Sequence, residues 1–396
     1  MKTGHMNKQR TTMNLIIKNY ENNQIKLQLS SFSNAGGITE YHALLSVLDP
    51  MLTFEKQTTL LLQAYQEMFN NELPTRAVAV FRRYFLSDAA NQHDFLIERE
   101  KGLFQGACSV VQQPPMNGTK IALWVYLQTE MTVRSHRDSF FETSHNGYRH
   151  LWYGGAFNKA ANSEYQTRLL LNNYIMLLSE QGCKLSDHCV RTWFFVQNVD
   201  VNYSGVVKAR KEVFVTQGLT EETHYISSTG IEGRHADPDV FVEMDAYAIA
   251  GMQPEQMQYL YAPTHLNPTY EYGVTFERGT TITYGDRKHL FISGTASINN
   301  RGEIVHPGDI LQQTARMMEN IAVLLKEGGA DTKDIVQALV YLRDPSDYQV
   351  VSEYFRTHYP EMPYLIVLGP VCRPGWLIET ECIAVTDAGD SRFMAF

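Results

Sequence analysis

The stretch Leu290-Phe291-Ile292-Ser293-Gly294-Thr295-Ala296 decides the fold, because it opens the clearest of three copies of one pattern. Its apolar and aromatic residues predict a strand. The pattern predicts further elements: a helix from Asp309 to Lys326, a strand over Ile335–Leu342, a short helix near Tyr348–His358 and a final strand pair ending in Leu377–Val385. The order strand–helix–strand–helix–strand indicates an α+β unit.

The middle of the chain repeats this pattern. Leu151-Trp152-Tyr153-Gly154-Gly155 resembles the first strand of the later copy. Gln166 to Gly182 has the same spacing as Gln313 to Gly329, and the segment 242–246 matches 378–382. A second unit of the same fold is therefore predicted.

A first copy is degraded but still recognisable. Gln57-Thr58 to Tyr126 has the same length as Gln313-Thr314 to Cys382. Three units of about 130 residues each then fill the chain, and repeats of this size are domains. We expect them around a pseudo-threefold axis, with strands lining a continuous inner barrel.

The expected unit boundaries follow from the repeats and from composition. Residues 12–128 form a degenerate scaffold unit, 129–250 a middle unit and 268–388 a C-terminal unit, while 250–268, rich in Pro, Gln and Tyr, is expected to be a linker. Residues 1–6 are left out of the fold argument.

Composition excludes several classes of function. The chain has 396 residues, a net charge of −9, 44% hydrophobic and 19% charged residues, which argues against general nucleic-acid binding. No apolar run approaches the ~20 residues of a membrane span. Five cysteines without CxxC pairing predict a reduced, cytoplasmic protein. Thirteen histidines without HxxxH or HxH spacing and the lack of a glycine-rich nucleotide loop predict no metal and no cofactor.

The third copy resembles the Rid (YjgF) family, once labelled endoribonuclease L-PSP. The resemblance rests on a distributed pattern, namely Ile292-Ser293-Gly294, Gln313, Asn320-Ile321, Gly329-Ala330, Asp334-Ile335-Val336, Tyr341-Leu342 and Ile378–Ala384. That family forms trimers of small α+β (chorismate-mutase-like) subunits with ligand clefts between neighbours. Three tandem units in one chain imply a single-chain pseudo-trimer, and we expect a monomer.

Longer stretches narrow the resemblance to the chorismatase branch. They are Ser293–Ile298 followed by His306-Pro307-Gly308-Asp309, Arg191-Thr192-Trp193, and Ser228-Thr229-Gly230-Ile231. Chorismatases cleave the enol ether of chorismate without a cofactor. The products are pyruvate and either a hydroxybenzoate or a dihydroxycyclohexadiene carboxylate. The resemblance implies a small dicarboxylate ligand, and it leaves open which of these products is formed.

One departure argues against an ordinary Rid enamine/imine deaminase. Those enzymes bind the substrate carboxylate with an arginine one residue after the proline that opens the last strand pair. The aligned segment here is Pro363-Tyr364-Leu365-Ile366, and the middle copy has His224-Tyr225-Ile226-Ser227. Losing a charge-assisted hydrogen bond costs about 1.5–3 kcal/mol, so deaminase recognition is disfavoured.

The candidate catalytic residues lie in Cys372-Arg373-Pro374-Gly375-Trp376-Leu377-Ile378-Glu379. This segment resembles one in the chorismatases. An enol ether is cleaved by protonating its methylene carbon, and a half-buried strand carboxyl has the raised pKa that this needs. Glu379 is the predicted acid, and Cys372 is the second candidate catalytic residue. The alternatives are a structural ion pair for Glu379 and simple burial for Cys372.

The candidate substrate-binding residues are those able to hold an anion. They are Arg373, Arg191, Arg278, Ser228, Thr229, Gly230 and Gly279. Arg191 is alternatively a structural bridge to Asp187 or Asp200, and the Ser228–Gly230 segment an ordinary turn. Gly279 together with Cys372 resembles the subgroup that makes 3-hydroxybenzoate. A non-catalytic metabolite-binding protein and a Rid-type deaminase of altered specificity remain the other two readings.

Overall fold

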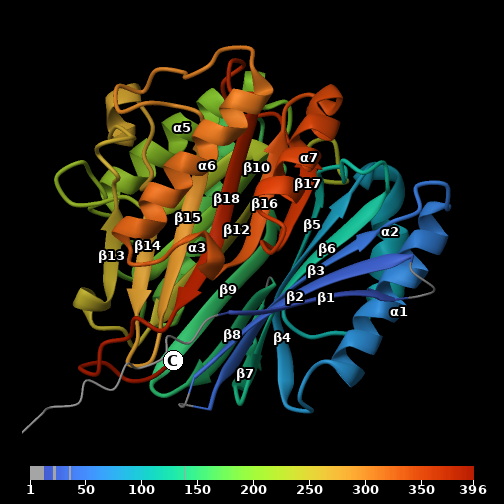
Figure 1. Cartoon of the computed structure of the whole chain (residues 1–396). Helices are drawn as coiled ribbons and strands as arrows, with labels where there is room; N and C mark the ends of the chain where they lie inside the picture. The colour runs from blue at the N-terminus through green and yellow to red at the C-terminus, as the bar shows by residue number, and fades with distance from the viewer. Residues whose placement is uncertain (1–12, 21–23, 35–36, 138) are drawn as a thin grey trace, which may run out of the picture.

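The computed structural model describes residues 13–20, 24–34, 37–137 and 139–396. Residues 1–6 and residue 12, the predicted start of the first unit, lie outside this part. The described strands form three sheets of six strands, each covered by helices (Figure 1). The fold is therefore α+β, built from three tandem units.

The first unit contains one six-stranded sheet and two helices. Its elements are β1 Asn14–Tyr20, β2 Ile25–Ser33, β3 Thr39–Val47, α1 Phe54–Asn71, β4 Ala77–Leu86, α2 Ala89–Glu100, β5 Ala107–Gln112 and β6 Ile121–Thr129. The strand order is β1-β2-β3-β6-β4-β5.

The middle unit repeats this arrangement. Its elements are β7 Thr132–Ser135, β8 Phe140–His145, β9 Tyr148–Phe157, α3 Ser163–Glu180, α4 Leu185–His188, β10 Cys189–Val196, α5 Val199–Thr216, β11 Ser227–Glu232 and β12 Val242–Ala250. Aligned on the first unit, the strand order is the same, β7-β8-β9-β12-β10-β11.

The last unit has the same order again, β13-β14-β15-β18-β16-β17. Its strands and helices are β13 Met257–Leu260, β14 Gly279–Thr283, β15 Lys288–Ala296, α6 Ile310–Glu327, β16 Ile335–Leu342, α7 Tyr348–His358, β17 Tyr364–Leu368 and β18 Ile378–Thr386. Short 3₁₀ turns lie at Pro254–Gln256, Thr269–Tyr272, Thr332–Asp334 and Pro345–Asp347. The predicted helices and strands of this copy are confirmed.

One parallel strand pair per sheet explains where the second helix of each unit lies. β4 pairs with β5, β10 with β11 and β16 with β17 in parallel register, and the other strand pairs are antiparallel. Parallel neighbours need a crossover connection, which α2, α5 and α7 provide. α5 is therefore held against β10 and β11, where the candidate site lies.

The linker prediction is wrong in part. Met257–Leu260, inside the segment read as a linker, is the edge strand β13 and pairs antiparallel with β14. The strand has only four residues and lies among Pro, Gln and Tyr, so its composition gives no strand pattern.

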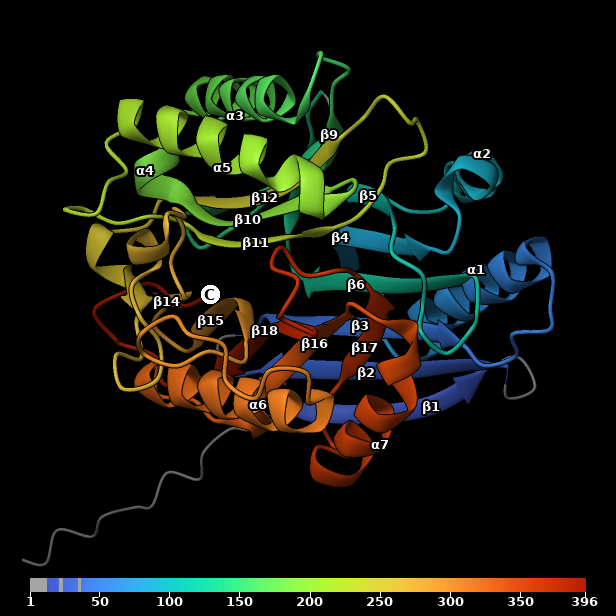
Figure 2. The same ribbon diagram turned by 90° about the horizontal axis from the view of Figure 1, so that it is seen from above.

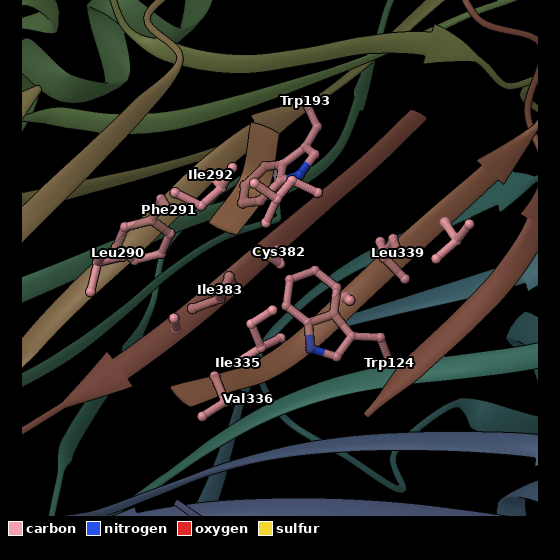
Figure 3. Close-up of a cluster of buried hydrophobic side chains, with 14 of the residues drawn as sticks. Trp124, Trp193, Leu290, Phe291, Ile292, Ile335, Val336, Leu339, Cys382 and Ile383 are labelled. Carbon is pink, nitrogen blue, oxygen red and sulfur yellow. The ribbon is translucent and has the colours of Figure 1, made fainter. Parts of the chain in front are cut away.

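The three sheets surround a shared core. From above, the helices lie outside and the strands inside (Figure 2). Trp124 of β6 and Trp193 of β10 are buried beside third-unit residues such as Ile292 and Leu339 (Figure 3). Aromatic side chains of this size bury 150–250 Å² each, so the units are joined by a common apolar centre.

The expectation of one continuous inner barrel is wrong. Within the described residues the strands form three separate sheets, and isolated bridges such as Ile231 to Val371 and Pro115 to Val367 connect them. Large side chains from the three units fill the centre.

A buried glutamine near the start of the main helix fastens the loop before the last strand in every unit. Gln57 accepts a hydrogen bond from the backbone of Lys120, Gln166 from Phe241 and Val242, and Gln313 from Leu377. The Gln313 amide also donates to the Gly375 carbonyl at 3.1 Å. In the last unit this loop carries the candidate residues Cys372 and Arg373.

Candidate active site

A cavity of about 340 Å³ lies between the middle and last units, a size typical of small-molecule sites. One wall comes from α5 and β11, and the other from the segments 272–278 and 372–379 with β15. Figure 2 shows β11 beside β15, and the two strands are in contact. Most of the predicted site residues line it, namely Glu379, Cys372, Arg373, Arg278, Ser228 and Gly230.

Glu379 lies on β18, opposite Ala296 of β15 and Tyr341 of β16. Its side chain is buried, and burial raises the pKa of its carboxyl to about 8, with the nearby Glu381 charge acting in the same direction. The positive charges of Arg191 and Arg278 oppose this shift. At neutral pH the carboxyl is therefore mostly protonated and able to donate a proton.

Gly294 makes room for this carboxyl. A Cβ at position 294 would collide with Glu379 Oε1. The register between β15 and β18 is irregular between Ile292 and Thr295, so a bulge brings Gly294 to the cavity. The Gly294 amide donates to Thr229 Oγ1 at 3.0 Å, which fixes the bulge across the unit boundary.

Arg191 and Thr229 lie behind the cavity and do not line it. The Arg191 guanidinium is buried and donates to Glu381 Oε2 at 2.7 Å, to Ser293 Oγ at 3.1 Å and to Thr229. Trp193 donates to the other Glu381 oxygen at 2.8 Å. Arg191 is a structural ion pair, but its partner is Glu381 and neither Asp187 nor Asp200.

Gly279 also lies outside the cavity lining. It pairs with Ile292 and Leu260 within the sheet, and a Cβ there would meet Leu260, Ile292 and the Phe291 carbonyl at 3.0–3.2 Å. Close packing between strands accounts for this glycine.

The two remaining arginines predicted from sequence, Arg278 and Arg373, line the cavity. Arg278 is buried, donates to the Asn267 carbonyl at 2.9 Å and lies over the rings of Tyr272 and Phe276. Arg373 donates to the Tyr272 carbonyl at 3.3 Å and is exposed. Within the described residues, no carboxylate forms an ion pair with either one, so both are free to bind an anion.

Cys372 is a neutral thiol near the acid. Burial raises its pKa to about 12, and the proximity of Glu379 adds to this effect. The Tyr203 side chain contacts it and, because it is buried, has a raised pKa of its own. Gly230 lets Tyr203 approach, because a Cβ there would collide with the phenol ring.

Tyr203 and Arg210 are among the lining residues that sequence reasoning did not propose for the site. They lie two helical turns apart on α5, so they share one face. Arg210 is buried among Val206, Ala209 and Val213. The sequence signal that could have pointed to Arg210 is an arginine within the apolar face of a predicted helix.

The first and middle units meet at a related but closed position. Glu243 lies opposite Phe157 next to an irregularity at Gly154-Gly155, as Glu379 lies next to Ser293-Gly294. There Gly154 and Gly155 pack against the Cys108 carbonyl, and Ser109 donates to Glu243 at 3.5 Å. In the first unit the corresponding residue, opposite the end of β4, is Ala122.

No group of three or more His, Cys, Asp or Glu side chains in the described residues is arranged to hold a metal ion. In the same part of the chain, no helix combines the length and apolarity needed to cross a membrane.

Comparison with known proteins identifies the family. Residues 282–386 match the family model of endoribonuclease L-PSP. A RutC family protein of Pyrococcus abyssi is 39% identical over 98 residues, 24% of this chain and 76% of that protein. The 3-aminoacrylate deaminase RutC of Acinetobacter baylyi is 30% identical over 98 residues, 24% of this chain and 77% of that protein. The chain belongs to the Rid/YjgF (L-PSP) family.

The whole-chain fold has a more specific likeness. A crystal structure of a chorismatase superposes with a TM-score of 0.61 at 17% identity, covering 78% of this chain and 93% of that one. The chain is thus a Rid-superfamily member with the fold of a chorismatase.

Proposed function

We propose that the chain cleaves the enol ether of chorismate in the cavity between its middle and last units, without a cofactor. The observation that carries the proposal is Glu379, a carboxyl with a pKa of about 8 facing a cavity lined by arginines. The chorismatase fold supports the same reaction.

The reaction begins with proton transfer from the Glu379 carboxyl to the methylene carbon of the enolpyruvyl group. The carbon bearing the ether oxygen becomes an oxocarbenium ion. In hydrolysis, water adds to that carbon and loses a proton to the Glu379 carboxylate. The resulting hemiketal collapses to pyruvate and a dihydroxycyclohexadiene carboxylate, while the ether oxygen leaves with a proton.

The substrate carries two carboxylates, and in this proposal Arg278 and Arg373 bind carboxylate oxygens while Ser228 and Gly230 shape the wall. Cys372 contacts the reacting group as a neutral thiol, because its pKa is raised. Attack by a ring hydroxyl in place of water leads to a hydroxybenzoate, and the product ring tells the two outcomes apart.

The units have different roles in this proposal. The first, predicted at 12–128, acts as scaffold, and the middle (129–250) and last (268–388) units hold the cleft. An imine deaminase is the weaker candidate, because neither β11 nor β17 carries an arginine.

The test is to incubate the pure protein with chorismate and to assay pyruvate while identifying the ring product by chromatography. Stoichiometric pyruvate is expected, and exhaustive chelation leaves the rate unchanged. If chorismate binds without pyruvate release, the protein is a metabolite-binding protein and the proposal is wrong.

A further inference from the structure

Arg210 is a buried cation on the middle-unit wall of the cavity. It lies on α5 and is almost fully buried. Its Nε donates to Thr275 Oγ1 at 3.2 Å, and its Nη1 lies 3.5 Å from Ser228 Oγ. Its Nη2 is buried and has no hydrogen-bond partner. A buried guanidinium nitrogen without a partner is costly, so this atom points to a ligand.

The other buried arginines that lie away from the cavity each have a carboxylate. Within the described residues the pairs are Arg82 with Glu100, Arg83 with Asp245, Arg191 with Glu381, and Arg287 with Glu40 and Asp286. Arg210 and Arg278, both lining the cavity, have no ion pair in this part of the chain. Each buried arginine away from the cavity is thus neutralised by a carboxylate, whereas the two buried arginines that line the cavity have no carboxylate partner among the described residues.

Two more residues lining the cavity have buried donors without acceptors. These are Tyr272, through its hydroxyl, and Trp376, through its indole Nε1. These two groups and the Arg210 guanidinium are hydrogen-bond donors. A ligand with several acceptor oxygens would provide the hydrogen bonds that they lack. Carboxylates are such acceptors.

The charges of the cavity favour an anion with two negative groups. Arg210, Arg278 and Arg373 carry positive charges without a carboxylate partner among the described residues, and Glu379 is mostly protonated at neutral pH because its pKa is raised. Lys208, also on α5, is paired with Glu164 at 3.0 Å and does not add a free charge.

We propose that Arg210 is a carboxylate-binding residue, and that this arginine sets how strongly the cavity prefers a compact dicarboxylate to a monocarboxylate. One carboxylate binds to Arg210 with help from the Ser228 hydroxyl, and the second binds to Arg278 and Arg373. The guanidinium reaches the cavity from helix α5, so no arginine on the neighbouring strand is needed. Only the identification of the dicarboxylate as chorismate rests on the proposed function.

The experiment compares isophthalate, a ring dicarboxylate, with benzoate by calorimetric titration. The wild type is expected to bind isophthalate more tightly than benzoate by about 10- to 100-fold, the worth of one charge-assisted contact. Arg210→Met is expected to remove most of this ratio, and Arg210→Lys to restore part of it. Lys211→Met, which removes the same charge one residue along α5 on its exposed side, keeps the wild-type ratio.

Circular dichroism and thermal unfolding confirm that the variants fold. If folded Arg210→Met keeps the full preference for isophthalate, the inference is wrong. Chorismate separates this outcome from failure of the proposed function. If the wild type releases no pyruvate but Arg210→Met loses the preference for isophthalate, the proposed reaction is wrong and the carboxylate-binding role of Arg210 is supported. If the wild type releases pyruvate and Arg210→Met leaves KM for chorismate unchanged, the role assigned to Arg210 is wrong and the proposed reaction is supported.

Discussion

In the proposed reaction, the protonation state of Glu379 sets the rate near neutral pH. Its pKa of about 8 comes mainly from burial and then from Glu381, so the group is an acid below that pH and an anion above it. General acid catalysis needs the protonated form. The activity should therefore follow the fraction of Glu379 that is protonated.

We predict that kcat for chorismate is level from pH 6 to pH 7 and falls tenfold per pH unit well above about pH 8. Cys372 and Tyr203 do not titrate in this window, because burial raises the pKa of both above it. The measurement is pyruvate release at saturating chorismate. A rate that rises through pH 8 would mean that an anion, and not an acid, drives the reaction.

Arg191 shows where residue-level prediction from sequence ends. Its neighbours in sequence suggested Asp187 or Asp200 as partners, yet Asp200 pairs with Arg343 and Arg191 pairs with Glu381. Strand residues at a unit boundary find their partners across the boundary, and sequence spacing does not record this. For Glu379, the burial and the raised pKa were predictable, because both follow from the apolar strand around it.

At the scale of elements, the Gln313 amide connects helix α6 to the loop 369–377. Its contacts with the Gly375 carbonyl and the Leu377 amide hold the segment that carries Cys372, Arg373 and Trp376. The same contact in the first unit joins Gln57 to Lys120, far from the cavity. The chain contains three such clamps, and of the two formed by Gln57 and Gln313 only the Gln313 clamp supports the candidate site.

We predict that Gln313→Ala and Gln57→Ala each cost about 1–3 kcal/mol of unfolding free energy, because each leaves buried backbone groups unpaired. Only Gln313→Ala is expected to raise KM for chorismate, by several-fold. Urea unfolding and steady-state kinetics measure the two effects. Equal KM changes in both variants would show that the loop is not held by this clamp.

Helices and central strands were predictable because their apolar periodicity is strong. α6, β16 and α7 have the expected positions, since Met317, Ile321 and Leu324 form one buried face and Gly329 takes a positive φ of 84° after the helix. The edge strand β13 was missed. An edge strand of four residues needs only one neighbour, and its pairing with β14 leaves no alternating pattern in the sequence.

At the scale of the whole molecule, the repeat was predictable from spacing alone, but the packing of the centre was not. Trp124, Trp152 and Trp193 lie there in one buried cluster with residues of the last unit. A group of buried histidines lies in the same core region. Trp124 contacts His42 at 3.3 Å and Tyr247 contacts His150 at 2.7 Å.

Burial lowers the pKa of His42 to about 3 and that of His150 well below its usual value. Between pH 6.5 and the folded pKa, the unfolded chain binds protons that the folded chain does not, so each histidine costs stability as the pH falls. At pH 5 the cost is about 2 kcal/mol for His42. The raised pKa values of Glu243 and Glu379 act in the opposite direction.

We therefore predict that replacing His42 changes how the unfolding free energy depends on pH. The unfolding free energy of His42→Gln, relative to wild type, should rise by about 2 kcal/mol between pH 7.5 and pH 5. His358→Gln, at the exposed end of α7, serves as the control for replacing a histidine by glutamine. Urea unfolding at the two pH values measures this. An unchanged difference for His42→Gln would mean that His42 is protonated in the folded protein.

The central claim is that Glu379 is the acid of a chorismate-cleaving cavity. The most direct test is pyruvate release at pH 7 by wild type, Glu379→Gln and Glu243→Gln, with dichroism confirming that each is folded. Glutamine keeps the size of the side chain but has no transferable proton, so Glu379→Gln should be slower by ~10²–10⁴-fold. Glu243→Gln, at the closed position between the first and middle units, should change stability more than rate. A folded Glu379→Gln variant that releases pyruvate at the wild-type rate would contradict the account.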